Sequence, residues 1–229
     1  MNWLASNPQY LFYILLITAL LLTRIPVLGK YFRSVNTLVH EAGHAFITLA
    51  LSGEVIAVNL FADTSGTTVT KAKGKIPQAL IALAGYPISS LTAWLCLWLL
   101  FKGYYLAILF ILTSIALIIM ILSLRNMYGL FWAGTFIVLN LLLIYFNNHT
   151  LIYAFATFYS LIIFTEAIIS AFVLMILAIK QPKKAGDATN LHKITKIPAA
   201  IWAFIMLIFA LFIGWISVMN YFPSIKTLI

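Results

Sequence analysis

The stretch HTLIYAFATFYSLIIFTEAIISAFVLMILAI, residues 149–179, decides the fold class of this chain. It contains no proline or glycine, and its one charged residue, Glu166, lies near its middle. A helix needs only about 20 apolar residues to cross a lipid bilayer. We therefore expect this stretch to form one membrane helix that tilts or projects beyond the bilayer.

The rest of the chain is similarly apolar. Of its 229 residues, 64% are hydrophobic and only 8% are charged, whereas soluble proteins have roughly 25% charged residues. Apolar runs bounded by charges, prolines and glycines span residues 9–29, 35–51, 77–101, 104–123, 127–146, 149–179 and 199–221. The sequence predicts one integral membrane domain, residues 1–229, with an all-α polytopic fold of six to seven transmembrane or re-entrant helices.

A small β-hairpin is predicted at about residues 53–75, directly after the second apolar run. Residues 55–61, VIAVNLF, and 67–70, TTVT, have the β-branched and aromatic composition of strands, and DTSG at 63–66 is typical of a turn. A second polar connection, the basic loop at about 180–198, carries five lysines around one acidic residue, Asp187.

Positive charge gathers in the connections between apolar runs. The net charge of +9 is typical of loops that face the cytoplasm and anionic lipid, so no nucleic-acid partner is expected. If the second run re-enters the membrane without crossing it, and the hairpin returns the chain to its starting side, most basic residues lie on one face of the membrane. One face then holds Lys30, Arg33, Lys71, Lys73, Lys75, Arg125 and the five lysines of the basic loop, and the other holds Lys102 and Lys226.

The second run carries the motif His40-Glu41-Ala42-Gly43-His44. Residues four apart lie on one face of a helix, so His40 and His44 can offer two imidazole nitrogens to one metal ion, with Glu41 beside it. Zinc lowers the pKa of its water toward about 7, and a neighbouring carboxylate can take the proton. The alternative is a buried helix in which these three side chains only satisfy one another.

A catalytic zinc site usually has three protein ligands, so one more is expected. Asp187 is favoured because the re-entrant topology places it on the same side as His40; its alternative role is to cap a helix that opens at 186–190 and runs into the last apolar run. Glu166 is the rival ligand, since an acidic residue in mid-membrane is a functional candidate, although pairing with Arg24 also explains it. The remaining acidic and histidine residues are expected in turns, strand ends and interfaces: Glu54, Asp63, His149 and His192.

Five blocks of sequence resemble the site-2 protease superfamily of membrane zinc metalloproteases, and most of all its short bacterial, B-type-like branch without a PDZ domain. These blocks are Val39–Ala45, Ser65-Gly66, Ala82–Pro87, Leu124–Asn126 and Gly186–Ala188. The resemblance implies a zinc peptidase buried in the membrane, with His40, His44 and Asp187 as metal ligands. The Asp-Gly motif that better-known members carry on a transmembrane helix is absent in that form.

These features predict a zinc metalloendopeptidase that hydrolyses peptide bonds within or next to the membrane, with Glu41 activating the water. Its substrate would be a membrane protein or peptide that must unwind, and the hairpin could bind it by strand addition. We expect Gly85 and Pro87 to interrupt the third run and bring backbone close to the site. The expected location is a bacterial cell membrane, with the site toward the cytoplasm. The alternatives are an inactive zinc-binding scaffold, or a glutamate-ligand peptidase that uses Glu166.

Overall fold

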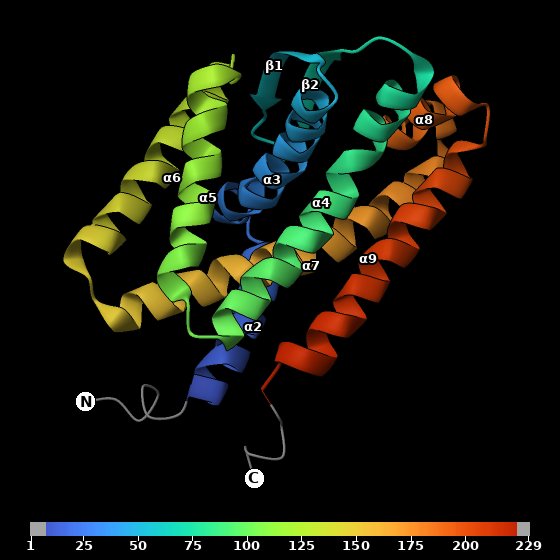
Figure 1. Cartoon of the computed structure of the whole chain (residues 1–229). Coiled ribbons are helices and arrows are strands. Elements are labelled where there is room, and N and C mark those ends of the chain that lie inside the picture. Colours follow the sequence, from blue (N-terminus) through green and yellow to red (C-terminus); the bar gives the residue numbers. More distant parts are fainter. Residues whose placement is uncertain (1–7, 224–229) are drawn as a thin grey trace.

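The computed structural model describes residues 8–223 and is built almost entirely of helices around one small sheet (Figure 1). The predicted opposite-face residue Lys226 lies outside the described part. The elements are α2 (Pro8–Leu22), α3 (Leu28–Ala50), β1 (Glu54–Leu60), β2 (Gly66–Lys71), α4 (Lys75–Phe101), α5 (Tyr105–Leu122), α6 (Met127–Phe146), α7 (His149–Lys180), the 3-10 turn η1 (Pro182–Lys184), α8 (Gly186–Thr195) and α9 (Ala199–Tyr221). Five of these helices, α4, α5, α6, α7 and α9, are long and apolar enough to cross a membrane. The predicted polytopic helical fold with a hairpin is confirmed.

Helix α7 is the longest helix of the described residues and runs diagonally through the bundle (Figure 1). Its 32 residues correspond to about 48 Å at 1.5 Å per residue, more than the roughly 30 Å of a hydrocarbon core. The expected tilt follows from this length. Its middle is buried, with Tyr159, Leu161 and Ile162 in the main core, so α7 is the element against which the other helices pack.

The first two apolar runs are divided differently from the prediction. Helix α2 ends at Leu22, and α3 begins at Leu28, not at residue 35. Pro26 lacks a backbone N–H and cannot continue the first helix, so the chain turns through Thr23–Val27, where Val27 has a φ of 70°. Hydropathy averaged over a window does not register this turn, because the apolar residues on both sides outweigh Thr23 and Arg24.

Helices α2 and α3 together cover the length that α4 covers alone (Figure 1). The start of α2 lies beside the end of α9, where the Tyr13 hydroxyl donates to the Pro223 carbonyl at 2.6 Å. The junction lies beside the middle of α7, and α3 ends at the hairpin. The two helices are thus placed end to end, and α3 does not return to its starting side as expected. Arg33 consequently lies beside the middle of α7 and not on the basic face.

The hairpin forms as predicted, with β1 and β2 antiparallel and Val58 opposite Thr68. The outer edge of β1 is occupied by the α5–α6 connection. The Val58 N–H donates to the Ser123 carbonyl at 2.7 Å, and the Arg125 N–H donates to the Val58 carbonyl at 3.0 Å. The Asn126 side-chain amide bonds both backbone groups of Leu60, at 3.1 and 2.5 Å. The sheet has two strands, so within residues 8–223 no strand pairs with the outer edge of β2.

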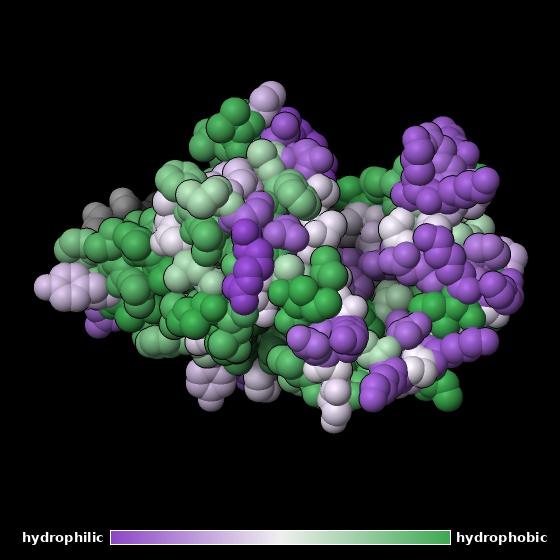
Figure 2. All heavy atoms as spheres, turned by 90° about the horizontal axis from the view of Figure 1, so that it is seen from above, coloured by the Kyte–Doolittle hydropathy of each residue, from purple (hydrophilic) through white to green (hydrophobic). Residues whose placement is uncertain are grey.

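The basic loop folds into η1 and a separate ten-residue helix, α8. Helix α8 does not run into the last membrane helix, because Lys196 takes a left-handed conformation with a φ of 67° and Pro198 follows. The hairpin, the start of α4 and α8 lie at the same end of the bundle (Figure 1). Seen from above, this end gathers hydrophilic side chains (Figure 2). The α4–α5 connection with Lys102 lies at the other end.

Candidate metal centre

Helix α3 places the predicted histidines on one face, in contact with α4. The Nε2 atoms of His40 and His44 are 3.1 Å apart, as expected for residues one turn apart whose rings point the same way. Gly43 lies between them in sequence, and a Cβ added there would lie 3.0 Å from the Cβ of Ile88. The absence of a side chain at position 43 therefore lets α4 pack closely against the helix that carries the motif.

Asp187 completes a three-residue cluster with the two histidines. Its Oδ2 atom is 3.1 Å from His40 Nε2 and 3.2 Å from His44 Nε2. Asp187 lies in the first turn of α8, but the N-cap residue is Ala185 and no side chain caps the helix, so the carboxylate does not have the capping role. Burial raises the pKa of Asp187, but the His44 charge and the hydrogen bonds from both imidazoles hold it well below its usual range. The carboxylate is therefore ionised.

The spacing of the three candidate donor atoms is compatible with a zinc ion. They form a nearly equilateral triangle with sides of 3.1 to 3.2 Å. Tetrahedral zinc with bonds of about 2.0 to 2.1 Å places neighbouring ligand atoms roughly 3.3 Å apart. Two imidazole nitrogens and one carboxylate oxygen, with a fourth direction left open, are the ligand set of a catalytic zinc site. Among residues 8–223, this is the group of His, Cys, Asp and Glu side chains that could hold a metal ion.

Helix α4 supplies the support behind the histidines. His44 Nδ1 lies 2.6 Å from the Ile81 carbonyl, which accepts its proton in a hydrogen bond, so Nε2 is the ring nitrogen that would bind a metal ion in place of a proton. The Tyr86 ring packs edge-on against His40, with centroids 4.6 Å apart. A Cβ at Gly85 would lie 2.5 Å from His40 Nε2 and 2.6 Å from His44 Nε2. The expected close approach of backbone at Gly85 is thus present.

The expected interruption of the third run at Pro87 is not found. Helix α4 continues without a break from Lys75 to Phe101, with Pro87 inside it. A proline removes one backbone hydrogen bond but can remain inside a membrane helix when neighbouring groups pack around it. The close approach to the histidines therefore comes from the missing side chain of Gly85, and not from an unwound segment.

Glu41 points toward the hairpin. It is 5% exposed, and its Oε2 accepts a hydrogen bond of 2.6 Å from the Thr68 hydroxyl on β2. Its other oxygen faces Gly66, where an added Cβ would lie 2.5 Å from Oε1. The sequence singled out Glu41, but Thr68, Ile81 and Tyr86 were missed as supporting residues. The alternation of β2 side chains predicts that Thr68 faces inward, but nothing local predicts which group it meets.

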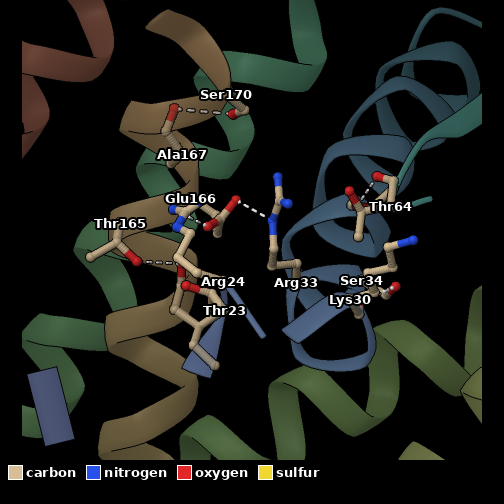
Figure 3. A network of polar contacts seen from close by, with 12 residues as sticks. Thr23, Arg24, Lys30, Arg33, Ser34, Thr64, Thr165, Glu166, Ala167 and Ser170 are labelled. Atoms are coloured by element: carbon tan, nitrogen blue, oxygen red, sulfur yellow. Dashed lines mark hydrogen bonds and ion pairs between the residues drawn. The ribbon is translucent and has the colours of Figure 1, made fainter. Parts of the chain in front are cut away.

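The rival ligand Glu166 does not belong to the candidate metal group and points toward Arg33 and Arg24 (Figure 3). It is 2% exposed and binds two arginines, Arg24 through Nη2 at 3.0 Å and Arg33 through Nε at 2.8 Å. Pairing with Arg24 was the expected alternative role of Glu166, and Arg33 is an additional partner. The network joins the α2–α3 junction to the middle of α7.

The remaining candidates have structural roles. Asp63 Oδ1 accepts hydrogen bonds from the Ser65 N–H at 2.9 Å and the Ser65 hydroxyl at 2.6 Å. These hydrogen bonds lower the pKa of Asp63 in the hairpin turn. Glu54 begins β1, His149 packs against the Tyr105 ring, and His192 Nδ1 bonds the Ile197 carbonyl at 2.9 Å. None of these residues belongs to the candidate metal group.

A cavity of about 840 Å³ lies over the cluster, large enough for several residues of a peptide. Its walls come from α3, the hairpin, α4, α7 and α8, and they include all four site residues, His40, Glu41, His44 and Asp187. The inner strand residues Gly66, Thr68 and Thr70 form part of one wall. The cavity therefore lies between β2 and the cluster of His40, His44 and Asp187.

Comparisons with known proteins agree with this arrangement. A family model described as Peptidase M50B-like matches residues 13–217, a range that includes the motif, the hairpin and α8. No curated protein and no solved structure matches the chain significantly.

Proposed function

The chain belongs to the M50B-like peptidase family, and from this premise we propose that it is a zinc endopeptidase that hydrolyses peptide bonds within or next to the membrane. Family membership confirms the resemblance to the site-2 protease superfamily and supports a membrane metallopeptidase in general. The observation that carries the specific proposal is the triangle of His40, His44 and Asp187 donor atoms beside Glu41. The reaction would take place in the cavity above it.

The proposed roles follow from the contacts of each side chain. His40, His44 and Asp187 would hold zinc, which supplies Lewis acidity toward a carbonyl oxygen and makes water acidic near neutral pH. Glu41 Oε2 is bonded to Thr68, so Oε1 is the oxygen left to take the proton of the attacking water. Glu41 would then return this proton to the departing amine nitrogen. The Ile81 carbonyl keeps His44 in the tautomer that leaves Nε2 available.

The hairpin supports a peptide substrate bound as an extended strand. The β1 edge is occupied by the α5–α6 connection, whereas β2 lines the cavity and has no strand partner on its outer side among residues 8–223. An extended peptide can add to such an edge through main-chain hydrogen bonds. Because the amides of a membrane helix are bonded within the helix, the substrate would have to unwind before its peptide bond reaches the site.

We also propose an orientation for the site. The hairpin, the Lys71–Lys75 segment and the basic loop lie at one end of the molecule (Figure 1). Positively charged connections favour the cytoplasmic side of a membrane. The site and its cavity would then open toward the cytoplasm, and the substrate would be a membrane protein or peptide reached from that side.

The decisive experiment replaces Glu41 with Gln, which keeps the shape of the side chain but removes the base. Loss of a positioned general base lowers the rate by about 10² to 10⁴-fold. The purified protein in lipid vesicles, with a membrane-spanning peptide as substrate, should therefore lose cleavage while it keeps one zinc per chain by mass spectrometry.

Two variants complete this experiment. Asp187→Asn should lose both zinc and activity, because it removes one of the three ligands. Glu166→Gln serves as the matched acidic control and should keep its zinc. Cleavage by Glu41→Gln at the wild-type rate would reject the peptidase mechanism and favour a zinc-binding scaffold. Full zinc in Asp187→Asn together with zinc loss in Glu166→Gln would reject the ligand assignment.

A further inference from the structure

We propose that Thr68 is a positioning residue that holds the Glu41 carboxylate in the orientation needed for proton transfer; this inference rests on the proposed function. The Thr68 hydroxyl lies 2.6 Å from Glu41 Oε2 and 3.1 Å from the Glu41 carbonyl. A hydroxyl has one proton to donate, and a separation of about 2.5 to 2.7 Å is typical of a bond to an ionised oxygen. The proton therefore goes to the carboxylate.

Gly66 makes the second contact that restrains the Glu41 carboxylate. It lies two residues before Thr68 on the same face of β2. A Cβ at position 66 would lie 2.5 Å from Glu41 Oε1 and 2.8 Å from Glu41 Cδ, so only a glycine leaves room for the carboxylate. One carboxylate oxygen thus receives the Thr68 hydroxyl proton and the other is held against the strand. Together the two contacts restrict rotation of the Glu41 carboxylate.

The Thr68 bond is not needed to locate the hairpin. Three other attachments hold the hairpin on the bundle. The Thr37 hydroxyl donates to the Thr64 carbonyl at 2.8 Å, the Ser123–Arg125 backbone pairs with Val58, and the Asn126 amide bonds Leu60. Removing the Thr68 hydroxyl should therefore leave the hairpin in place and free only the carboxylate. A loss of catalysis with the hairpin still in place would therefore indicate that Thr68 positions the carboxylate and does not merely support the fold.

The placement of Thr68 links substrate binding to the base. Strand β2 has no strand partner on its outer edge within residues 8–223, and it also carries the only hydroxyl that binds the Glu41 carboxylate among the described residues. A peptide that pairs with β2 would fix the strand and, through Thr68, the orientation of Glu41. The base would then be held most firmly when a substrate strand is present.

The test compares Thr68→Val, which keeps the branched shape, with Thr68→Ser, which keeps the hydroxyl. Misplacement of a catalytic group by about 1 Å can lower a rate about 100-fold. We expect Thr68→Val to lower kcat by about 10 to 100-fold while KM and zinc content stay at the wild-type values. Thr68→Ser should recover most of this loss. Thr113→Val removes a buried hydroxyl from α5, which does not line the cavity, and is the matched control.

A second readout does not depend on activity. In the metal-free protein, thermal unfolding of Thr68→Val, Glu41→Gln and the double variant should show non-additive shifts, because Thr68→Val removes the hydrogen bond that Glu41→Gln weakens by replacing an ionised acceptor with a neutral one. The shifts of Thr113→Val and Glu41→Gln should be additive, because Thr113 does not contact Glu41. Wild-type kcat in Thr68→Val, equal losses in the Val and Ser variants, or additive shifts for positions 41 and 68 would overturn the inference. If Glu41→Gln itself cleaves normally, the proposed function fails instead.

Discussion

The contact between Gly85 and the two histidines gives the sharpest test of the metal centre. In Gly85→Ala, the new methyl group would lie 2.5 Å from His40 Nε2 and 2.6 Å from His44 Nε2. Ordinary van der Waals contacts of a Cβ begin at 3.4 Å, so each ring must move by about 0.8 to 0.9 Å or α4 must withdraw. Zinc–ligand distances tolerate only about 0.2 Å. The substitution therefore displaces both imidazole nitrogens that are proposed to bind zinc.

The expected loss of zinc affinity can be bounded. Changing one group that orients a metal ligand typically costs about 10 to 100-fold in affinity. Because Gly85→Ala disturbs two ligands directly, we expect a loss of at least about 100-fold, which corresponds to about 2.7 kcal/mol. Competition with a chromophoric zinc chelator in detergent measures this change. Gly134→Ala on α6, where an added Cβ meets nothing within 4 Å, is the matched control. A zinc Kd for Gly85→Ala within threefold of the control would refute the reasoning.

Two further predictions concern regions outside the metal cluster. Glu166→Ala leaves Arg24 and Arg33 without their carboxylate. Since both arginines are partly exposed, we expect the free energy of unfolding, measured by heat or denaturant, to fall by about 1.5 to 3 kcal/mol. The zinc stoichiometry should not change, and loss of zinc in the folded variant would contradict this prediction. The pKa of Asp63 is lowered in the folded hairpin by its hydrogen bonds with Ser65. Its contribution to the stability of the hairpin is therefore present above the unfolded pKa of about 3.9 and is lost as the pH falls through the lower pKa of the folded state. Hydrogen exchange at the Ser65 amide should therefore lose protection at acidic pH in the wild type, and an equal loss in Asp63→Asn would show that another group is responsible.

Local features of the sequence predicted the part of the site that lies within one element. His40, Glu41 and His44 are fixed by helical periodicity, and the hairpin by its β-branched residues around a turn. Asp187 lies 147 residues from His40, and no local rule joins them. Charge distribution and the family resemblance pointed to it, although the topology assumed for that argument differs from the observed one.

The predictions that the structure contradicts concern features that hydropathy does not reveal. The run at 9–29 appeared continuous because the apolar residues on both sides outweigh Arg24 and Pro26 in hydropathy, and the helix break there shifted the start of α3 by seven residues. Arg33 was placed on the basic face because charge counting assumes that arginines in a connection face water, whereas here Glu166 binds it inside the bundle. Thr68 was missed because its role depends on how the hairpin docks on α3.

The end-to-end placement of α2 and α3 also bears on biosynthesis. Arg24 and Arg33 emerge from the ribosome 142 and 133 residues before Glu166, the partner that neutralises them. At about 5 to 20 residues per second, this interval lasts roughly 7 to 28 seconds, during which both arginines must remain near water or lipid headgroups. Asp187 follows later still. A nascent chain that has not yet reached Glu166 and Asp187 would therefore lack both the ion pairs that hold α3 and the third of the proposed ligands, so the proposed activity would arise only after α8 has been made.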